Sequence, residues 1–481
     1  MTTVLRFGFA LIACAAALAA GCGGGGGGGG GKSPSGIDRG GITIAQGPIS
    51  GFGSVIVNGV HYSTSGATIT LDDQPGSESE LRVGQVVRIE GTLDANGTTG
   101  TARTVAYDDN VEGPVQSIDL AASRLVVLGQ SVQVGPATSF DDSIVPRSLE
   151  GLLVGDRVEV SGLVGSDGVI AATRIEGRAA SVTVDVRGVA SGVDTASHLL
   201  QVNGLVVDYA SAQLSGFAAG QPANGDVVEA NGALDGAGVL VAARLEKRSE
   251  SLPGTSNDDA DLEGLVTRFV SATDFDVAGQ RVTTTAATVY QDGTVANISL
   301  DVSLEVSGGF DASGRIVAQK IEFSRPSDRE FVGPVDSVNA ATNSLTLLGQ
   351  SIRTTAQTRF EDHSAADLQR FSLADVHVGD VVEVRGYLDA GVVVATLLER
   401  EDAAGAGAEV EVKGLATSVS PPNLTVAGVP VTTDGLTEFR DNSGVSITAA
   451  AFFAVAAGHD VKARGTMVGN TVLATRAELE N

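Results

Sequence analysis

The sequence predicts an all-β protein made of about six tandem copies of one small five-stranded domain, preceded by an export signal and a glycine-rich segment. Three observations lead to this prediction. Glycine accounts for 63 of 481 residues, and tryptophan is absent; with many β-branched residues, this composition favours strands and tight turns over long helices. Related segments return at intervals of about 70 to 79 residues. Within one copy, five runs of strand length follow one another.

Residues 1–21 have the organisation of a secretory signal peptide. Arg6 supplies positive charge, residues 7–20 are mostly apolar, and small residues precede Cys22. The apolar stretch is shorter than the roughly 20 residues that a membrane-spanning helix needs, which argues against a transmembrane anchor. The segment resembles the lipobox of bacterial lipoproteins, whose cysteine is acylated and becomes the N-terminus. This resemblance implies lipidation at Cys22 and a membrane as partner through the lipid.

Residues 22–43 comprise this cysteine and a predicted glycine-rich tether. Gly23–Gly31 is an uninterrupted glycine run, and such segments behave as flexible chains. Acyl chains contribute about 0.8 kcal/mol per buried methylene, so two or three of them would hold the protein firmly at a membrane. The residue after Cys22 is a glycine. By resemblance to lipoprotein sorting rules, an aspartate at that position would imply retention in the inner membrane. We therefore expect an exported protein anchored to the outer membrane.

Internal repetition is clearest between the second and fifth copies. Residues 111–118 and 331–338 share G-P-V-x-S, and residues 154–160 and 378–384 share V-G-D-x-V-E-V. A turn glycine recurs in all copies, at Gly59, Gly129, Gly204, Gly279, Gly349 and Gly428, and a second glycine recurs at Gly91, Gly162, Gly232, Gly308, Gly386 and Gly465. We assign six β-repeats to residues 44–110, 111–178, 182–248, 262–325, 331–400 and 409–481, with linkers at residues 249–261 and 401–408.

The second copy shows the expected strand order. Its β-branched runs lie at Val111–Ile118, Leu125–Leu128, Ser131–Val134, Arg157–Ser161 and Val169–Glu176, with a tight turn expected at Gly129-Gln130. The stretch between the third and fourth runs has room for a short helical turn. Three strands, an insert and two strands resemble the order of the OB-fold, a small five-stranded barrel. The sequence therefore predicts tandem OB-like barrels.

Charge and cysteine content exclude several classes of function. The formal net charge of −27 and the pI of about 4.4 argue against nucleic-acid binding, which needs a local excess of Lys and Arg. The two cysteines are Cys14, inside the apolar leader, and Cys22. A mature chain beginning at Cys22 would have no thiol free for disulfides, redox chemistry or a cysteine-based metal site.

Acidic pairs are the most suggestive polar feature. Asp141, Asp142, Glu361 and Asp362 are candidate ligands for calcium, which takes six to eight oxygens, although we prefer to interpret them as solvated acidic loops. The five histidines lack the spacing of a zinc site, and we interpret them as solvated. No serine-nucleophile motif G-x-S-x-G occurs. We therefore expect no catalytic residues and no cofactor, with calcium as the one open alternative.

Strand alternation predicts cross-strand charge pairs on the outer barrel face. In residues 158–160 the two valines should face inward and Glu159 outward, and Arg174 follows fifteen residues later. The same spacing relates Glu229 to Arg244 and Glu305 to Lys320. We expect these pairs to contribute roughly 0.2–1 kcal/mol each to stability.

Together, the lipobox, the tether and the repeated segments resemble an uncharacterised family of β-domains in bacterial lipoproteins, domain of unknown function 5666. The fourth copy departs from the pattern, with Asp301-Val302 in place of Gly-Asp. The resemblance implies an exported, repeated, β-rich protein and brings no catalytic residues. Our first hypothesis is a non-enzymatic cell-envelope lipoprotein whose modules act as a spacer or as a scaffold binding envelope protein or polysaccharide. The alternative is a divalent-cation-dependent adhesin or polysaccharide binder that uses the acidic loops.

Overall fold

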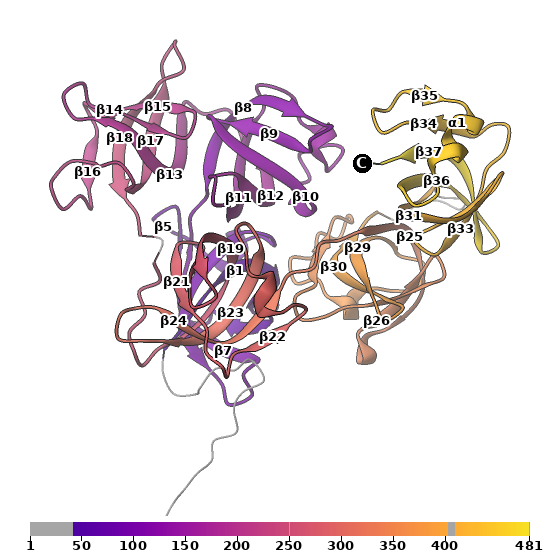
Figure 1. Ribbon diagram of the computed structural model, residues 1–481, viewed down its shortest axis with the longest axis horizontal. Helices are drawn as coiled ribbons and strands as arrows, with labels where there is room; N and C mark the ends of the chain where they lie inside the picture. The colour runs from indigo at the N-terminus through magenta and orange to yellow at the C-terminus, as the bar shows by residue number, and fades with distance from the viewer. Residues whose placement is uncertain (1–41, 250, 403–408, 481) are drawn as a thin grey trace, which may run out of the picture. The chain divides into compact units, whose positions relative to one another are not determined.

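The computed structural model describes residues 42–249, 251–402 and 409–480. The expected signal peptide, Cys22, nearly all of the glycine tether and residues 403–408 of the second linker lie outside the described residues. Strands dominate the described chain, and its one α-helix is α1 (Ala449–Val455) (Figure 1). No helix among the described residues is long and apolar enough to span a membrane. The all-β fold class is confirmed.

Repeat 2 shows how one barrel closes. Its strands are β8 (Val111–Asp119), β9 (Arg124–Val127), β10 (Gln130–Phe140), β11 (Arg157–Val164) and β12 (Ile170–Gly177), with a 3-10 turn, η2 (Leu149–Gly151), before β11. They pair in the ring β8–β9–β10–β12–β11–β8, in which only β10 and β12 run parallel. The ring leaves an outer edge of β8 free at Val111 and Glu112, and a strand of the next barrel pairs with it there. This ring is the OB-like barrel predicted from the strand order.

The same ring recurs in the other copies. Repeat 1 contains β1 (Thr43–Gly51), β2 (Val55–Val57), β3 (Val60–Ser63), β6 (Val86–Leu93) and β7 (Thr99–Tyr107). Repeat 3 contains β13 (Thr183–Asp194), β14 (Leu199–Val202), β15 (Leu205–Asp208), β17 (Val227–Leu234) and β18 (Leu240–Lys247). Repeat 4 contains β19 (Asp259–Ser271), β20 (Asp274–Val277), β21 (Gln280–Thr283), β23 (Ser303–Phe310) and β24 (Ile316–Phe323).

Repeats 5 and 6 follow the same plan. Repeat 5 contains β25 (Arg329–Asn339), β26 (Ser344–Leu347), β27 (Gln350–Arg353), β29 (Val381–Asp389) and β30 (Val392–Arg400). Repeat 6 contains β31 (Val410–Ser420), β32 (Asn423–Val426), β33 (Val429–Thr432), β36 (Asp460–Val468) and β37 (Thr471–Leu479). Short extra elements lie between the third and fourth barrel strands: β4 (Thr68–Leu71), β5 (Gln74–Pro75), β16 (Gln213–Ser215), β22 (Val289–Gln291), β28 (Arg359–Asp362), β34 (Glu438–Arg440), β35 (Ser446–Ile447), η1 (Glu78–Glu80), η3 (Val295–Asn297) and η5 (Leu373–Asp375). One more 3-10 turn, η4 (Ala340–Thr342), lies between the first and second strands of repeat 5.

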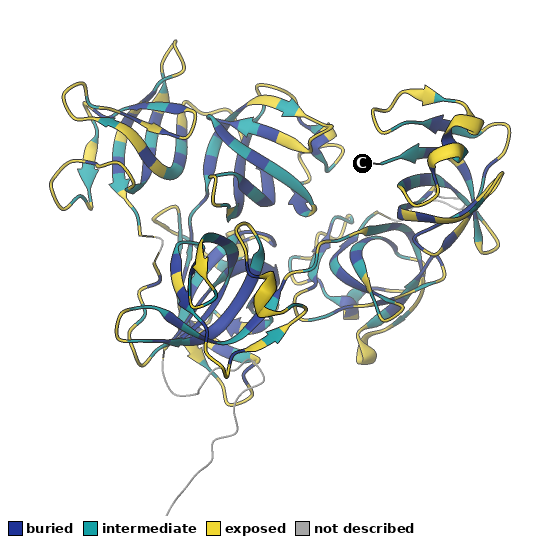
Figure 2. Cartoon of the chain, in the orientation of Figure 1, coloured by how far each residue is buried: buried dark blue, intermediate teal, exposed yellow. Residues whose placement is uncertain are grey.

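Each barrel is filled by aliphatic side chains from alternate strand positions. Val158 and Val160 are fully buried, as the sequence predicts, and they pack with Leu125, Val127 and Ile175. Figure 2 shows this alternation of buried and exposed residues along the strands. The apolar core of repeat 2 is continuous with that of repeat 3, and the core of repeat 5 with that of repeat 6.

The turn glycine allows a two-residue hairpin. Leu128 has φ 49° and Gly129 φ 73°, and Val127 pairs with Gln130, so the turn is Leu128-Gly129 and lies one residue earlier than expected. Two successive positive φ values are typical of the turns that match the strand twist. Positive φ values at both residues recur at Asn58-Gly59, Ala278-Gly279, Leu348-Gly349 and Ala427-Gly428.

The second recurring glycine lies at a β-bulge. Ser161 pairs with Arg174 whereas Gly162 pairs with Ala172, so Thr173 is an extra residue in β12. A Cβ on Gly162 would lie 2.4 Å from the carbonyl oxygen of Ala171. Any residue other than glycine would therefore clash with the backbone here. The same register shift occurs at Gly91, Gly232, Gly308, Gly386 and Gly465.

The bulge overturns most of the predicted charge pairs. Glu159 lies opposite Glu176, while Arg174 lies opposite Ser161, and Glu229 likewise lies opposite Glu246. The prediction of exposed Glu159–Arg174 and Glu229–Arg244 pairs is therefore wrong, and Glu159 is 2% exposed. In repeat 4, Lys320 does contact Glu305, at 3.2 Å, but from a diagonal position. Counting residues could not include the extra bulge residue.

First strands join the barrels in pairs. β8 of repeat 2 pairs antiparallel with β13 of repeat 3, through Val111↔Val186 and Glu112↔Asp185. β25 and β31 join repeats 5 and 6 in the same way. β1 of repeat 1 instead pairs parallel with β19 of repeat 4, beginning at Thr43↔Asp259. Residues 259–261 of the expected linker therefore belong to a strand.

Candidate functional site

The structure separates the four acidic residues proposed from the sequence as calcium ligands. Asp141 accepts a hydrogen bond from the Ser143 amide at 3.0 Å. Asp362 accepts from the Arg400 guanidinium at 2.5 and 2.8 Å. Asp142 and Glu361 lie near one histidine and have basic partners, described below. The four carboxylates do not surround one point.

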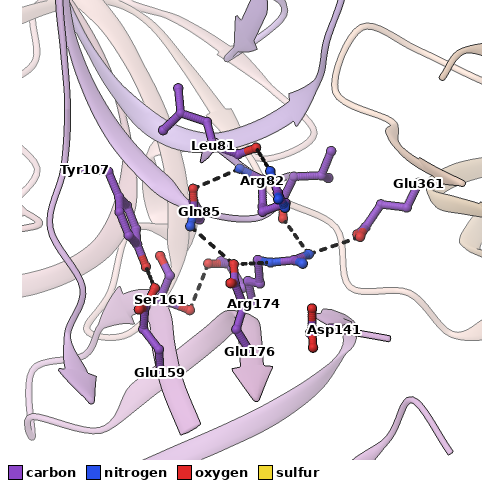
Figure 3. Close-up of polar contacts among 12 residues, drawn as sticks. Leu81, Arg82, Gln85, Tyr107, Asp141, Glu159, Ser161, Arg174, Glu176 and Glu361 are labelled. Carbon is purple, nitrogen blue, oxygen red and sulfur yellow. Dashed lines mark hydrogen bonds and ion pairs between the residues drawn. The ribbon is translucent and has the colours of Figure 1, made fainter. Parts of the chain in front are cut away.

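Arg174 forms a buried polar junction between repeats 1, 2 and 5, which Figure 3 shows. Its Nε donates to Glu176 at 2.6 Å, and its terminal nitrogen donates to Glu361 of repeat 5 at 3.1 Å and to the Val83 carbonyl of repeat 1 at 3.2 Å. Gln85 of repeat 1 donates to Glu176 at 3.2 Å. Burial alone would lower the pKa of Arg174, but Glu361 and Glu176 raise it above its usual value. The junction therefore holds a charged guanidinium between two carboxylates.

A second buried contact joins repeats 1 and 2. The Tyr107 hydroxyl donates to Glu159 at 2.6 Å, and the Arg178 Nε donates to the other Glu159 oxygen at 2.8 Å. The Val86 amide donates to the Ser161 hydroxyl at 2.9 Å. Burial raises the pKa of Glu159 despite Arg178 and Tyr107. These hydrogen bonds stabilise the contact between the two barrels, because a buried polar group without a hydrogen-bond partner destabilises the fold.

His363 is surrounded by carboxylates. Its Nδ1 lies 2.6 Å from Asp142 of repeat 2, and its Nε2 lies 3.3 Å from Glu399 and 3.8 Å from Glu361. Burial lowers the pKa of His363, but Glu399 and Glu361 together raise it to about 9. Burial raises the pKa of Glu399, but Arg385 and His363 bring it to about 2. The positive charge of protonated His363 thus offsets the negative charge of the carboxylates around it.

The position of His363 differs from the sequence interpretation. Its side chain is only 6% exposed, whereas we interpreted all the histidines as solvated. No spacing rule could have found it, because Asp142 and Glu399 come from distant parts of the chain. The one local signal was its place directly after the acidic pair Glu361-Asp362.

Asp109, Glu112 and Glu159 form a further group that could hold a metal ion, with carboxylate oxygens within 4.8 Å of one another. Asp109 precedes β8, Glu112 lies on β8 and Glu159 lies on β11. Burial raises the pKa of Asp109 well above its usual value, and the carboxylates of Asp185 and Glu159 raise it further. This group, unlike the His363 cluster, includes no basic member.

A cavity of about 730 Å³ lies beside α1 in repeat 6. Its lining is largely apolar and includes Pro422, Phe439 and Phe453. Asp434 is its one ionisable lining residue, so the cavity presents no pair of groups suited to acid–base or nucleophilic catalysis.

The comparison with known families agrees with the repeats. The sequence profile of a domain of unknown function (DUF5666) matches residues 43–106, 112–176, 187–246, 263–322, 332–399 and 413–478. Each match begins in the first strand of one barrel and ends in its fifth strand. No curated protein is significantly similar to the chain.

Proposed function

The chain belongs to the DUF5666 family, and on that premise we propose that it is a non-enzymatic, membrane-anchored lipoprotein of the bacterial cell envelope. Its tandem barrels act as a spacer or as a binding scaffold outside the cytoplasm. Cys22 carries the lipid, and the glycine run that follows separates the barrels from the membrane surface. The partner is a protein or polysaccharide of the envelope.

The observation that carries the scaffold proposal is the way in which barrels join. Strand pairing joins repeats 2 and 3 and repeats 5 and 6, and buried ion pairs through Arg174 link repeat 2 to repeat 5. The polar side chains of the Arg174 junction and of the Tyr107–Glu159 contact hold barrels together instead of lining a cleft. Repeated similar surfaces on one support suit several weak contacts acting together, because linked contacts raise the effective concentration of one another.

Lipidation is tested by expressing the full chain in a bacterium and separating it between detergent and aqueous phases. We expect the wild type in the detergent phase, with an acylated N-terminal peptide that begins at Cys22 by mass spectrometry. Cys22→Ser should abolish acylation and processing, whereas Cys14→Ser is the matched control and should change neither. An unacylated wild-type chain would refute the anchor.

Scaffold binding is tested in intact cells by photo-crosslinking from exposed positions. Leu436 of repeat 6 is 91% exposed and is a suitable position for a crosslinker, while buried Val461 serves as the control. A specific crosslink from Leu436 to an envelope protein or polysaccharide supports a binding scaffold. If exposed positions on all six repeats give no crosslinks, the binding scaffold is refuted and only the spacer role remains.

A further inference from the structure

Four carboxylates lie side by side across the sheet that joins repeats 2 and 3. Asp185 of β13 pairs with Glu112 of β8, Glu112 pairs with Glu159 of β11, and Glu159 pairs with Glu176 of β12. Directly opposite residues have Cβ atoms about 4.5–5.5 Å apart, and like charges at such positions destabilise a sheet. A row of acids across four adjacent strands therefore needs compensating positive charge.

The equivalent row between repeats 5 and 6 provides that charge within the protein. There Arg464 lies opposite Glu411, and Val332 separates Glu411 from Glu383. Lys462 contacts Glu411 at 2.6 Å, and Arg385 contacts Glu383. The repeated architecture thus offers an internal comparison in which basic and apolar residues accompany the carboxylates.

Each of these residues is replaced between repeats 2 and 3. By register, Asn231 occupies the position of Arg464, Glu229 that of Lys462 and Glu112 that of Val332. Ser161 occupies the position of Arg385. Every change removes a positive charge or adds a negative one. Arg157, Arg178 and Arg174, which stand where repeat 5 has Val381, Glu401 and Leu397, bind Glu112, Glu159 and Glu176. Among the described residues, no base forms an ion pair with Asp109, Asp185 or Asp72.

Asp109 points into this row without a partner of its own. It is 5% exposed, and its carboxylate lies within 4.8 Å of oxygens from Glu112 and Glu159. Among the described residues, none donates a hydrogen bond to this carboxylate or forms an ion pair with it. Its amide donates to Asp72 at 3.1 Å, which adds another acid to the group.

The loop that carries Asp109 is held firmly. The Asn110 amide donates to the Val160 carbonyl at 3.0 Å, and its side-chain oxygen accepts from the Gly162 amide at 2.7 Å. The Asn110 carbonyl accepts from the Arg187 amide of repeat 3 at 3.0 Å. Asp109 is therefore placed toward the row by its neighbours in both barrels.

The protonation equilibria agree with missing positive charge. Burial raises the pKa of Asp72 to about 7, and neighbouring carboxylates, including Glu159, contribute. Burial and Glu229 raise the pKa of Asp185 well above its usual value. A cation placed among such groups favours their ionised forms and reverses these shifts.

We propose that Asp109, Glu112 and Glu159 bind one calcium ion at the junction of repeats 2 and 3, with Asp185 and Asp72 contributing negative charge around it. The donors are all carboxylate oxygens, the ligands that hard cations prefer, and no softer nitrogen or sulfur ligand belongs to the group. Calcium here would join the end of repeat 1, which carries Asp109, to repeat 2, beside the sheet that repeat 2 shares with repeat 3. The inference does not depend on the lipid anchor or on the identity of an envelope partner.

The test is calorimetric titration of the full chain, freed of metal with a chelator, with calcium chloride. We expect one site with a Kd of about 10⁻⁴ to 10⁻³ M or tighter, the range of extracellular calcium modules, and a higher unfolding temperature in calcium. Asp109→Asn keeps the side-chain size and should weaken binding at least tenfold. Asp108→Asn is the matched neighbouring control and should bind calcium as the wild type does.

A second measurement separates a calcium ligand from a structural carboxylate. Without calcium, Asp109→Asn should unfold at a higher temperature than the wild type. To fold, the wild type must either bury a charge beside Glu112 and Glu159 or take up a proton there, whereas asparagine has no ionisable group. A carboxylate needed only for the fold would give the opposite result. The proposal is overturned if 10 mM calcium, a concentration about tenfold above the weakest expected Kd, produces neither binding heat nor a thermal shift. It is also overturned if Asp109→Asn binds calcium like the wild type.

Discussion

The imidazolium of His363 should make repeat 5 sensitive to alkaline pH. Burial lowers the pKa of His363, and the carboxylates of Glu399 and Glu361 raise it to about 9 from an ordinary value of 6.5. The groups that face it are these two carboxylates, Asp142 and the more distant Arg147, which lowers the pKa. A raised pKa means that the folded state holds the proton more tightly. The stabilisation is complete below pH 6.5 and is lost as pH rises through about 9.

The expected size follows from the shift. At about 1.36 kcal/mol per pKa unit, the change from 6.5 to about 9 corresponds to about 3 kcal/mol of unfolding free energy. Urea unfolding from pH 6 to pH 10 would compare the wild type with His363→Gln, which cannot titrate, following the transition of repeat 5 by hydrogen exchange in β28 and β30. The wild-type advantage should be greatest near pH 6 and should shrink by about 3 kcal/mol by pH 10.

The matched control is His377→Gln, because the His377 side chain is 75% exposed. This variant should unfold like the wild type at every pH. A stability difference between the wild type and His363→Gln that stays constant from pH 6 to pH 10 would refute the assignment of a buried imidazolium.

Three further predictions concern the fold, and urea unfolding checks each of them. Arg174→Met removes the nearest base from two buried carboxylates and should lower the free energy of unfolding by about 3–5 kcal/mol, whereas the exposed Arg103→Met should change it little. Equal losses would contradict the role of the junction. Tyr107→Phe removes a hydrogen bond to a buried carboxylate and should cost about 1.5–3 kcal/mol; an unchanged midpoint would argue against that contact. Gly129 and Gly349 share a φ of 73°, so Gly129→Ala and Gly349→Ala should each lower the free energy of unfolding by about 1–2 kcal/mol. The loss should be larger at Gly129, because a Cβ there would lie 2.6 Å from the backbone of Gly204. Equal losses would exclude that steric contribution.

Features that depend on neighbours in the chain could be predicted from the sequence. The β-branched runs and the turn glycine located the strands of repeat 2 to within a few residues, because strand alternation and hairpin turns are local properties. The register of the last hairpin was predicted wrongly, because the recurring glycine at Gly162 was not interpreted as a bulge and the bulge adds one residue to β12. Pairing between repeats 1 and 4 was equally hidden, because any of the first strands could have served as partner.

In the candidate site, too, local sequence features could be predicted and contacts between distant residues could not. Sequence reasoning placed Asp142 and Glu361 in the same class of acidic loop, but it could not show that both meet His363, or that Arg174 binds Glu361. In the sequence Asp109 looks like the other acidic pairs, and its distinction comes from burial beside Glu112 and Glu159. Three-dimensional neighbours therefore decide which acids are neutralised.

The pairing of β1 with β19 has a consequence for the order in which the chain is made. Synthesis proceeds from the N-terminus, so repeat 1 emerges while the partner of its first strand, which begins at Asp259, still awaits translation. At roughly 5–20 residues per second, the delay across about 200 residues is about 10–40 s. During that time the backbone amides and carbonyls of Thr43–Gln46 that later pair with β19 are open to strands from other nascent chains. Repeats 2 and 5 meet their partners as soon as the following barrel emerges, so the earliest-made barrel is the one that waits longest for protection against misassembly.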